Sequence, residues 1–577
     1  MITLKKNISE KIAEKLLAAF PASELDADTI CSMLEYPPDD KMGDLALPCF
    51  KMSKALRRAP VQIAAAIADG FEADGVEKAE AVNGYFNIYL DGAYVAGKVI
   101  RESEDKKEKY GSPDIGEGKT VVLDYSSPNL AKPFHIGHLG TTVIGHSIRK
   151  LHEFAGYKCV GINYVGDWGT QFGKLIVAYK KWGNRETVEN GGVDALVDLY
   201  VKINNAISGN EEQGIPADPA LADEARAEFC KMEQGDEENL ELWRWLVKLS
   251  LKANEEIYKQ LDISFDSYKG ESNYTKEMPE QIQRLRDKDL LKIDDGASIV
   301  DLEEYGMPPC LILKRDGSSL YPTRDIAAAY DRKQMYDFDK AIYVTSAGQS
   351  LHFAQWFKVV ELMGYDWYDK LVHVPYGTVS INGSKLATRT GNVILLRDLF
   401  ALAIEKVSKI MDEKNPDLEG KEKIAEDIGV GAVVFYYLSN NRIRDINFIM
   451  EDALSFDGNT GPYAQYTYAR TCSVLAKAGD FNMGECVVES QEERALAKTL
   501  AMFEEKVREA IDVYEPSVIT RYILDVAAAF NRFYHNCTIL GADNEALRAS
   551  RLALCKATKT VLGNAFGLIC MRKTEKI

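Results

Sequence analysis

The amino-acid sequence predicts a multidomain α/β protein. We expect a small N-terminal α+β domain, a Rossmann-like domain with a doubly wound parallel sheet, and an all-helical C-terminal domain. The length supports several domains, because 577 residues make about three to five at roughly 100–200 residues each. In the middle of the chain, short apolar strands alternate with longer helical patterns, as in parallel α/β sheets. After about Asp398 the strand patterns stop and helical patterns continue.

The N-terminal domain is expected at residues 1–110. Behind Asn7, which can cap a helix, four apolar residues recur at helical spacing: Ile8, Ile12, Leu16 and Phe20. A second helical pattern covers residues 61–68, and the aromatic and β-branched run at residues 80–91 predicts a strand. The charged, glycine-containing run at residues 106–119 predicts a linker.

The parallel sheet is expected within residues 115–400. Its predicted strands are the short apolar runs at residues 121–123, 159–165, 310–313, 341–345 and 371–374. A helix is expected from about Phe134, after the first strand, and an acidic helical pattern at about residues 185–270 predicts an insertion. Residues 401–577 are expected to form the helical domain.

The composition excludes several classes of protein. The formal charge is −18, from 70 Lys and Arg against 88 Asp and Glu, whereas a protein that coats nucleic acid nonspecifically is basic. A specific nucleic-acid partner stays open, because basic residues can gather locally. The longest clean apolar run, residues 428–438, is too short to span a bilayer, and the N-terminus does not resemble a signal peptide. Ten cysteines without a CxxC pair argue against a disulfide framework or a zinc knuckle, so we expect a cytoplasmic enzyme without a membrane segment.

The most informative segment runs from Asp124 to His138 and reads DYSSPNLAKPFHIGH. His135 and His138 lie three residues apart, so they share one face of the first helical turn, and Gly137 lets a ligand approach the backbone. A helix N-terminus attracts anions, and two imidazoles there can donate to a phosphoryl group that gains charge during transfer. The alternative is a pair of surface or capping histidines. With 7 His and 42 Gly, chance predicts only roughly 0.006 HxGH matches in this chain.

This segment resembles the HIGH motif of class I aminoacyl-tRNA synthetases, and the longer string SSPNLAKPFHIGH is similar to the arginyl-tRNA synthetases among them. The resemblance continues at residues 165–173 (VGDWGTQFG), 321–325 (YPTRD) and 458–466 (GNTGPYAQY). It implies that residues 1–110 bind the tRNA elbow, 115–400 form the catalytic domain and 401–577 bind the anticodon.

The resemblance also implies an activity. The chain is expected to activate L-arginine with ATP and Mg²⁺, releasing pyrophosphate, and to transfer arginine to the 3′-terminal ribose of tRNA(Arg). No organic cofactor and no zinc are implied, and we expect a monomer.

The second class I motif, KMSKS, is degenerate here. Its nearest match is Lys385-Leu-Ala-Thr-Arg389, which lacks the second lysine. In the family a lysine just before HIGH supplies the missing charge, and Lys132 occupies that place. The resemblance therefore implies these catalytic residues: Lys132, His135, His138 and Lys385. It implies these ATP-binding residues: His135, Gly137, His138, Gly377, Val379 and Lys385. The backbone around Gly377 and Val379 matches the adenine-binding strand of the family, and a buried strand without a ligand is the alternative. A solvated basic loop is the alternative for both lysines.

The arginine pocket should offer carboxylates, since a guanidinium carries five donors and a permanent charge. By resemblance, Tyr321 and Asp325 hold the guanidinium, and Gln349, at a helix start, is a further contact. Tyr321 is expected to end a strand, with Thr323 capping the next helix. The residues alone leave an ordinary first-turn carboxylate open for Asp325.

Two more residues match contacts near the α-amino and carboxylate groups of the substrate, namely Asp124 and Asn129. For Asp124, a polar strand end without a ligand is the alternative.

Of all the expected sites, the tRNA-binding surfaces have the fewest sequence signals. Tyr463 and Tyr466, three apart on an expected helix, are positioned to stack on unpaired anticodon bases, although such aromatics are also common in cores. Asn83 is the candidate in the N-terminal domain. The chain departs from the family at Gly140, where an arginine is usual, and in its C-terminal tail, residues 570–577.

Overall fold

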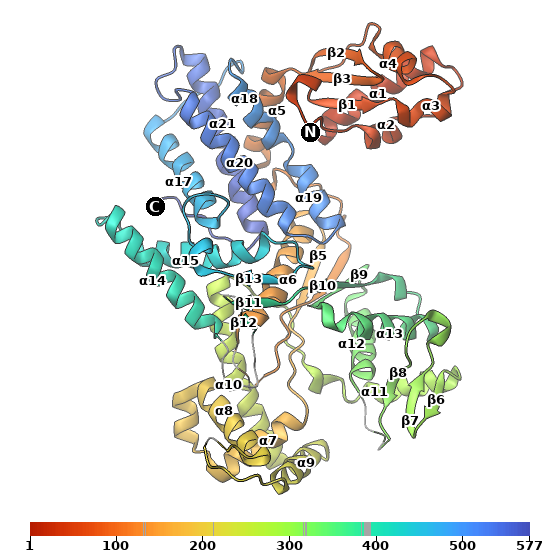
Figure 1. Cartoon of the computed structure of the whole chain (residues 1–577), viewed down its shortest axis with the longest axis vertical. Coiled ribbons are helices and arrows are strands. Elements are labelled where there is room, and N and C mark those ends of the chain that lie inside the picture. The colour runs from red at the N-terminus through yellow and green to blue at the C-terminus, as the bar shows by residue number, and fades with distance from the viewer. Residues whose placement is uncertain are drawn as a thin grey trace.

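The computed structural model describes residues 1–130, 132, 134–211, 213–315, 317, 320–381, 384–385 and 394–577. For residues 40, 384 and 385 it describes the backbone alone. In Figure 1 the N-terminal sheet lies at the upper right, the C-terminal helices lie at the upper left, and the central sheet lies below them. Across the described ranges, no helix is both long and apolar enough to cross a bilayer.

The N-terminal region packs helices against a three-stranded antiparallel sheet in the order β1-β3-β2. Its elements are α1 (Ile2–Ala19), α2 (Ala27–Met33), β1 (Leu45–Pro48), α3 (Phe50–Leu56), α4 (Pro60–Ala68), β2 (Val76–Val82) and β3 (Tyr85–Leu90). The single strand predicted at residues 80–91 is wrong, because the chain reverses at Asn83 and Gly84. Both residues have positive φ (50° and 84°), as an Asn-Gly hairpin turn requires.

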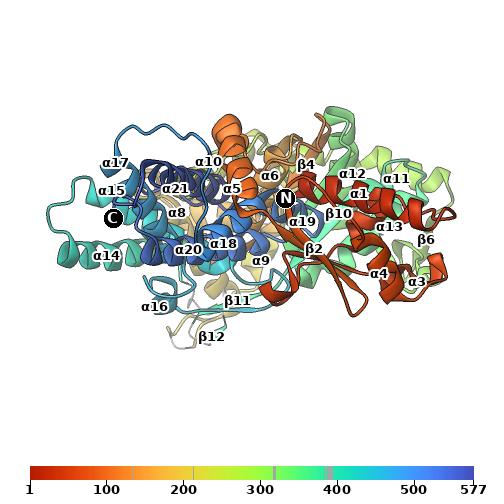
Figure 2. The same ribbon diagram turned by 90° about the horizontal axis from the view of Figure 1, so that it is seen from above.

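Helix α5 (Gly92–Lys106) follows, capped by Asp91, which accepts the backbone N–H groups of Ala93 and Tyr94. Figure 2 shows α5 between the N-terminal domain and the C-terminal helices, beside α18. In the predicted linker at residues 106–119, Lys106 still belongs to α5, residues 107–109 form the 3₁₀ turn η2 (Lys107–Lys109), and the rest is turns and coil.

The central sheet is parallel, as predicted, with strand order β10-β9-β4-β5. Its strands are β4 (Thr120–Asp124), β5 (Lys158–Ile162), β9 (Lys340–Ser346) and β10 (Leu371–Tyr376). The chain runs from β4 to β5 and later returns on the other side of β4. The strand order therefore reverses between β4 and β9, and ligands of such sheets bind at the carboxyl ends of the strands there.

The prediction that residues 310–313 belong to the parallel sheet is wrong. They form β8 (Cys310–Leu313), the edge of a separate antiparallel sheet with β6 (Leu291–Asp294) and β7 (Ala297–Val300). A tight turn at Asp295 and Gly296, both with positive φ, pairs β6 with β7. A short apolar run does not reveal the direction of its neighbour, so the sequence could not separate the two arrangements.

Between β5 and β6 the chain forms a helical cluster with its own apolar core, seen at the bottom of Figure 1. Its helices are α7 (Thr170–Trp182), α8 (Arg185–Ser208), α9 (Ala220–Glu233) and α10 (Glu237–Leu261). The expected helical insertion at about residues 185–270 falls on α8, α9 and α10.

The C-terminal region is mostly helical, with α14 (Leu396–Lys414), α15 (Lys421–Leu438), α16 (Met450–Ala453), α17 (Gly461–Ala478), α18 (Gln491–Ala501), α19 (Phe503–Asp512), α20 (Ser517–Asn536) and α21 (Glu545–Leu568). The expectation that strands end near Asp398 is wrong. A short strand, β13 (Ile446–Phe448), pairs in parallel with β11 (Val379–Ile381), which also pairs with β12 (Ser384–Lys385). Three residues carry too little periodicity to be recognised in a sequence.

Candidate active site at the carboxyl edge of the central sheet

The loop after β4 places the start of α6 (Ile136–Phe154) at the point where the strand order of the sheet reverses. Ser126 and Ser127 have positive φ (70° and 43°) and turn the chain sharply. The Ser126 hydroxyl lies 2.8 Å from that of Thr142 on α6 and 2.7 Å from that of Tyr258 on α10. The turn is thereby fixed to the helix that it precedes.

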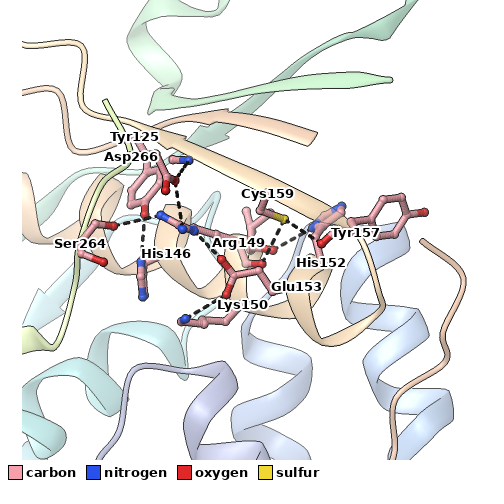
Figure 3. A network of polar contacts seen from close by, with 12 residues as sticks. Tyr125, His146, Arg149, Lys150, His152, Glu153, Tyr157, Cys159, Ser264 and Asp266 are labelled. Carbon is pink, nitrogen blue, oxygen red and sulfur yellow. Dashed lines mark hydrogen bonds and ion pairs between the residues drawn. The ribbon is translucent and has the colours of Figure 1, made fainter. Parts of the chain in front are cut away.

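The far end of α6 is anchored by a polar network (Figure 3). Arg149 ion-pairs with Glu153 (2.7 Å) and Asp266 (3.1 Å) and donates to the Ser264 carbonyl (3.0 Å). Asp266 also accepts the backbone N–H of Gly161 in β5 at 2.7 Å. These contacts fix the orientation of α6 against the sheet, and with it the position of the helix N-terminus.

His135 and His138 form a reciprocal cap at that N-terminus. Nδ1 of His135 accepts the backbone N–H of Gly137 at 3.0 Å, and Nδ1 of His138 accepts that of His135 at 3.1 Å. The capping alternative is therefore realised, and it has a chemical consequence. Because both Nδ1 atoms accept, each neutral ring carries its proton on Nε2 and is left with a donor.

The surroundings keep both rings neutral. Burial, together with the charge of Lys132, lowers the pKa of His135 to about 4. Burial, His135 and Lys132 lower the pKa of His138 to about 3. The ring centroids lie 3.9 Å apart, so the two imidazoles act as one donor pair. Lys132 itself is exposed.

The segment after the degenerate second motif returns to this pair. His135 and Leu395 form an antiparallel bridge, and Leu396 donates its backbone N–H to the Phe134 carbonyl at 3.0 Å. The backbone of Lys385 lies in β12, whereas its side chain and the whole of Arg389 fall outside the described residues.

On the other side of the reversal, α12 (Tyr321–Tyr336) carries Tyr321 and Asp325 one turn apart. Tyr321 begins this helix and does not end a strand, because Pro322 fits the first helical turn. Thr323 does not cap the helix, since its hydroxyl donates to the Ile312 carbonyl at 2.7 Å. Both expectations for this turn are therefore wrong.

The candidate arginine contacts differ in exposure. Tyr321 is 64% exposed, and the Asp325 carboxylate lies 2.6 Å from Nε2 of His352 on α13 (Ser350–Leu362). Gln349 is exposed, ends the 3₁₀ turn η5 (Ala347–Gln349) after β9 and is the N-cap residue of α13, so its predicted place at a helix start is confirmed. Asn129 is exposed and its backbone bridges to Gly166.

Asp124 already has partners inside the protein. Its carboxylate pairs with Arg332 of α12 at 2.8 Å and accepts the Ser127 hydroxyl at 2.8 Å. Asp124 is 6% and Arg332 2% exposed. Burial raises the pKa of Asp124, and Arg332 opposes that shift. This geometry favours the alternative reading of Asp124, a polar strand end that holds α12 against β4.

Sequence reasoning missed several residues around these candidate contacts. Glu271, in η3 (Glu271–Tyr274), ion-pairs with Arg324 at 3.0 Å, next to Asp325. Burial raises the pKa of Glu271 to about 7 against the opposing charge of Arg324. The guanidinium of Arg332 lies over the rings of Tyr164 and Tyr343. More than 50 positions separate Glu271 from Arg324, so no local spacing signals the pair.

The expected adenine strand is interrupted. Gly377 follows β10, and its N–H donates to the Arg442 carbonyl at 2.8 Å. A Cβ at Gly377 would lie 2.4 Å from the Arg444 carbonyl oxygen, so backbone packing requires the glycine. Val379 is buried and begins β11, paired with Ile446.

Gly140, the departure after HIGH, is also explained by packing. A Cβ there would lie 2.2 Å from the hydroxyl oxygen of Tyr437 on α15 and 3.2 Å from the ring of Tyr376. A helix of the C-terminal region fills the space that a side chain at this position would need.

The candidate tRNA residues lie far from this site. On α17, the Tyr463 hydroxyl accepts a hydrogen bond from Asn531 at 2.9 Å, whereas Tyr466 is 43% exposed. The guanidinium of Arg470 lies 4.9 Å from the Tyr466 ring centroid and 4.8 Å from that of Tyr534. Asn83 lies in the β2–β3 turn. Within the described part of the chain, no group of three or more His, Cys, Asp or Glu side chains is arranged to hold a metal.

Comparison with known proteins decides the family. The family described as "tRNA synthetases class I (R), catalytic domain" matches residues 101–450. This chain belongs to the arginyl-tRNA synthetase family. The "Arginyl tRNA synthetase N terminal domain" matches residues 3–90, and the "DALR anticodon binding domain" matches residues 464–577. The resemblance read from the motifs is thereby confirmed.

Individual arginyl-tRNA synthetase family members agree over the whole length. The arginine–tRNA ligase of Alkaliphilus metalliredigens is 47% identical over 95% of this chain and 96% of its own. That of Clostridium perfringens is 46% identical over 99% and 100%. In fold, the chain is similar to Thermus thermophilus arginyl-tRNA synthetase, with a TM-score of 0.83 at 24% identity and full coverage of both chains.

Proposed function

We propose how this member of the family divides its reaction among its residues. As a member it is an arginine–tRNA ligase, which joins arginine to tRNA with ATP. The observation that carries the proposal is the histidine pair, whose Nδ1 atoms are occupied by backbone N–H groups and whose Nε2–H groups remain as donors.

In the first step, the arginine carboxylate attacks the α-phosphorus of Mg·ATP in line. A new P–O bond forms as the bond to the leaving pyrophosphate breaks, which gives arginyl-adenylate. Charge grows on the phosphoryl and leaving oxygens, and His135 and His138 stabilise it as neutral donors that need no reorganisation. Lys132 and Lys385 add positive charge to the phosphates, and Gly137 lets them approach the helix N-terminus.

Arginine is selected on the α12 side. Asp325 receives the guanidinium, with Tyr321, Gln349 and Asn129 as further contacts, and Glu271 adds a second carboxylate. His352 and Arg324 hold these two carboxylates before the ligand arrives. Asp124 acts through Arg332, by fixing α12, and not by touching the substrate.

Adenine binds to the segment between β10 and β11. The N–H of Gly377 is engaged by Arg442, so the purine must use the Gly377 carbonyl or the backbone of Val379.

In the second step, a hydroxyl of the terminal ribose of tRNA(Arg) attacks the adenylate carbonyl, and AMP leaves. We propose residues 1–110 for elbow binding, with Asn83 as a contact, and 401–577 for the anticodon, with 115–400 as the catalytic domain. The exposed Tyr466, beside Arg470, suits base stacking, whereas Tyr463 supports that surface through Asn531.

The protein is proposed to work as a cytoplasmic monomer without zinc or an organic cofactor. The ten cysteines, which are scattered through the sequence without a CxxC pair, support a reducing compartment.

Aminoacylation of mixed tRNA with each of the twenty amino acids tests the function. Only arginine should be incorporated, and ATP–pyrophosphate exchange should require arginine; measuring exchange with and without tRNA shows whether activation needs tRNA. Incorporation of another amino acid, or exchange without arginine, would contradict the proposal.

A further inference from the structure

Arg442, in the turn between α15 and β13, binds the proposed adenine segment on both sides of Tyr376. Its Nη1 donates to the Pro375 carbonyl at 3.0 Å, and its own carbonyl accepts the N–H of Gly377 at 2.8 Å. The side chain and the backbone of Arg442 therefore hold residues 375–377, which lie just before β11.

The same guanidinium binds a second region. Its Nε donates to the Tyr514 carbonyl at 2.9 Å and its Nη2 to the Val513 carbonyl at 3.3 Å. These carbonyls follow the end of α19, where the helix has no further intrahelical donors and its dipole favours a cation. Tyr514 has a φ of 53°, which turns the chain toward α20. Arg442 thus connects the C-terminal helices to the adenine segment directly.

Neighbouring contacts extend this attachment along the segment. Asp445 accepts both the backbone N–H and the hydroxyl of Thr378, at 2.7 and 2.8 Å, and Ile446 donates to the Thr378 carbonyl at 2.8 Å. Beyond them β13 pairs with β11. Asp445 and the β13 backbone therefore support residues 378–381, next to the residues that Arg442 holds.

We propose that Arg442 is a positioning residue for ATP. It fixes the position of the Gly377–Val379 backbone relative to the histidine pair. The inference rests on the proposed function, because the ATP contact that Arg442 positions is this backbone. Binding through backbone groups depends on their placement to within about half an ångström. Arginine suits the role, since its rigid planar fork directs donors from three separate nitrogens at three carbonyls, whereas a lysine offers its three donors from a single nitrogen.

The test compares Arg442→Met with a matched control, Arg444→Met. Arg444 lies two residues further on; its side chain is exposed and makes no hydrogen bond or ion pair to a described residue. Both substitutions remove one positive charge from the same turn. ATP and arginine KM are measured in aminoacylation with saturating tRNA, and binding of a non-hydrolysable ATP analogue is measured directly by calorimetry.

For Arg442→Met we expect the ATP KM and the analogue Kd to rise about tenfold, because hydrogen bonds from a charged group are lost. The arginine KM should stay within about twofold, as should every constant of Arg444→Met. Arg442→Lys should restore part of the ATP affinity, and it replaces Arg442→Met if the latter fails to fold.

Three outcomes would overturn the inference: an unchanged analogue Kd in a folded Arg442 variant, equal rises in the ATP and arginine KM, or the same ATP defect in Arg444→Met. Failure of the proposed function is separate, because wild-type protein would then not attach arginine to tRNA at all.

Discussion

The phosphate end and the arginine end of the site hold charge in different ways. At the phosphate end, two neutral imidazoles at a helix N-terminus offer N–H donors to an anion. At the arginine end, the carboxylates of Asp325 and Glu271 lie against His352 and Arg324. A neutral donor costs little when its ligand is absent, whereas an unpaired buried carboxylate is expensive.

This difference predicts which substitutions should change substrate binding and which should change the reaction rate. Donors that face developing charge act mainly in the transition state, so their loss should lower kcat. Carboxylates that face a guanidinium act equally on substrate and transition state, so their loss should raise KM. Breaking either end therefore has its own kinetic signature.

The largest effect is expected for Asp325→Asn. Removing the charge from a desolvated guanidinium pair should cost about 3–5 kcal/mol, which raises the arginine KM by roughly two orders of magnitude or more. The ATP KM should change little. Steady-state aminoacylation with each substrate varied measures both. A near-normal arginine KM would return Asp325 to the role of a first-turn carboxylate on α12.

His138→Ala should act on rate, and somewhat less. The loss of one donor to the phosphoryl group should lower kcat for adenylate formation by about two orders of magnitude, roughly 3 kcal/mol, with a smaller change in ATP affinity. His138→Asn, which keeps an amide donor, should recover part of the rate. Equal losses in ATP binding and in rate would show that the imidazole binds ground state and transition state alike.

The contrast between the two ends also explains what the sequence could predict. At the phosphate end, the histidine pair and Lys132 lie within the 15 residues from 124 to 138, so helix capping and dipole rules apply to them directly. Even there, the tautomer of each ring needed the backbone positions. The arginine end gathers Glu271, Asp325 and His352 from separate elements, and no local spacing relates them.

Two errors in the predicted fold have the same origin. Residues 310–313 and 446–448 are short strands whose partners are fixed by the tertiary structure, at β7 and at β11. The strand prediction at residues 80–91 is wrong for a different reason, because Asn83-Gly84 is a hairpin-turn signal that divides this run between two strands. Long periodic helices and the parallel strands on either side of β4 were predicted correctly.

A smaller effect is expected for Lys132→Ala, because this lysine is exposed and solvent screens its charge. If it supplies the charge missing from the degenerate second motif, single-turnover adenylate formation should slow by about tenfold while tRNA binding is unchanged. Arg389→Ala and the double mutant form the comparison. Strong non-additivity would place both residues on one phosphate group. A change below about threefold would leave Lys132 as a solvated loop residue.

The smallest effect concerns the pH dependence of arginine binding. Burial raises the pKa of Glu271 to about 7, so this carboxyl is protonated and neutral in a fraction of the protein molecules at physiological pH. The raised pKa means that the protonated form dominates below about pH 7 and the anion above it. Because the anion attracts a guanidinium, the arginine KM should fall as pH rises through 7, by about threefold to tenfold.

Glu271→Gln should raise the KM at pH 8 and flatten the profile between pH 6 and 8. The ATP KM, set at the end where both histidines stay neutral over this range, serves as the internal control. An arginine KM that keeps its full pH dependence in Glu271→Gln would assign the titration to another group and leave Glu271 with the structural task of holding Arg324.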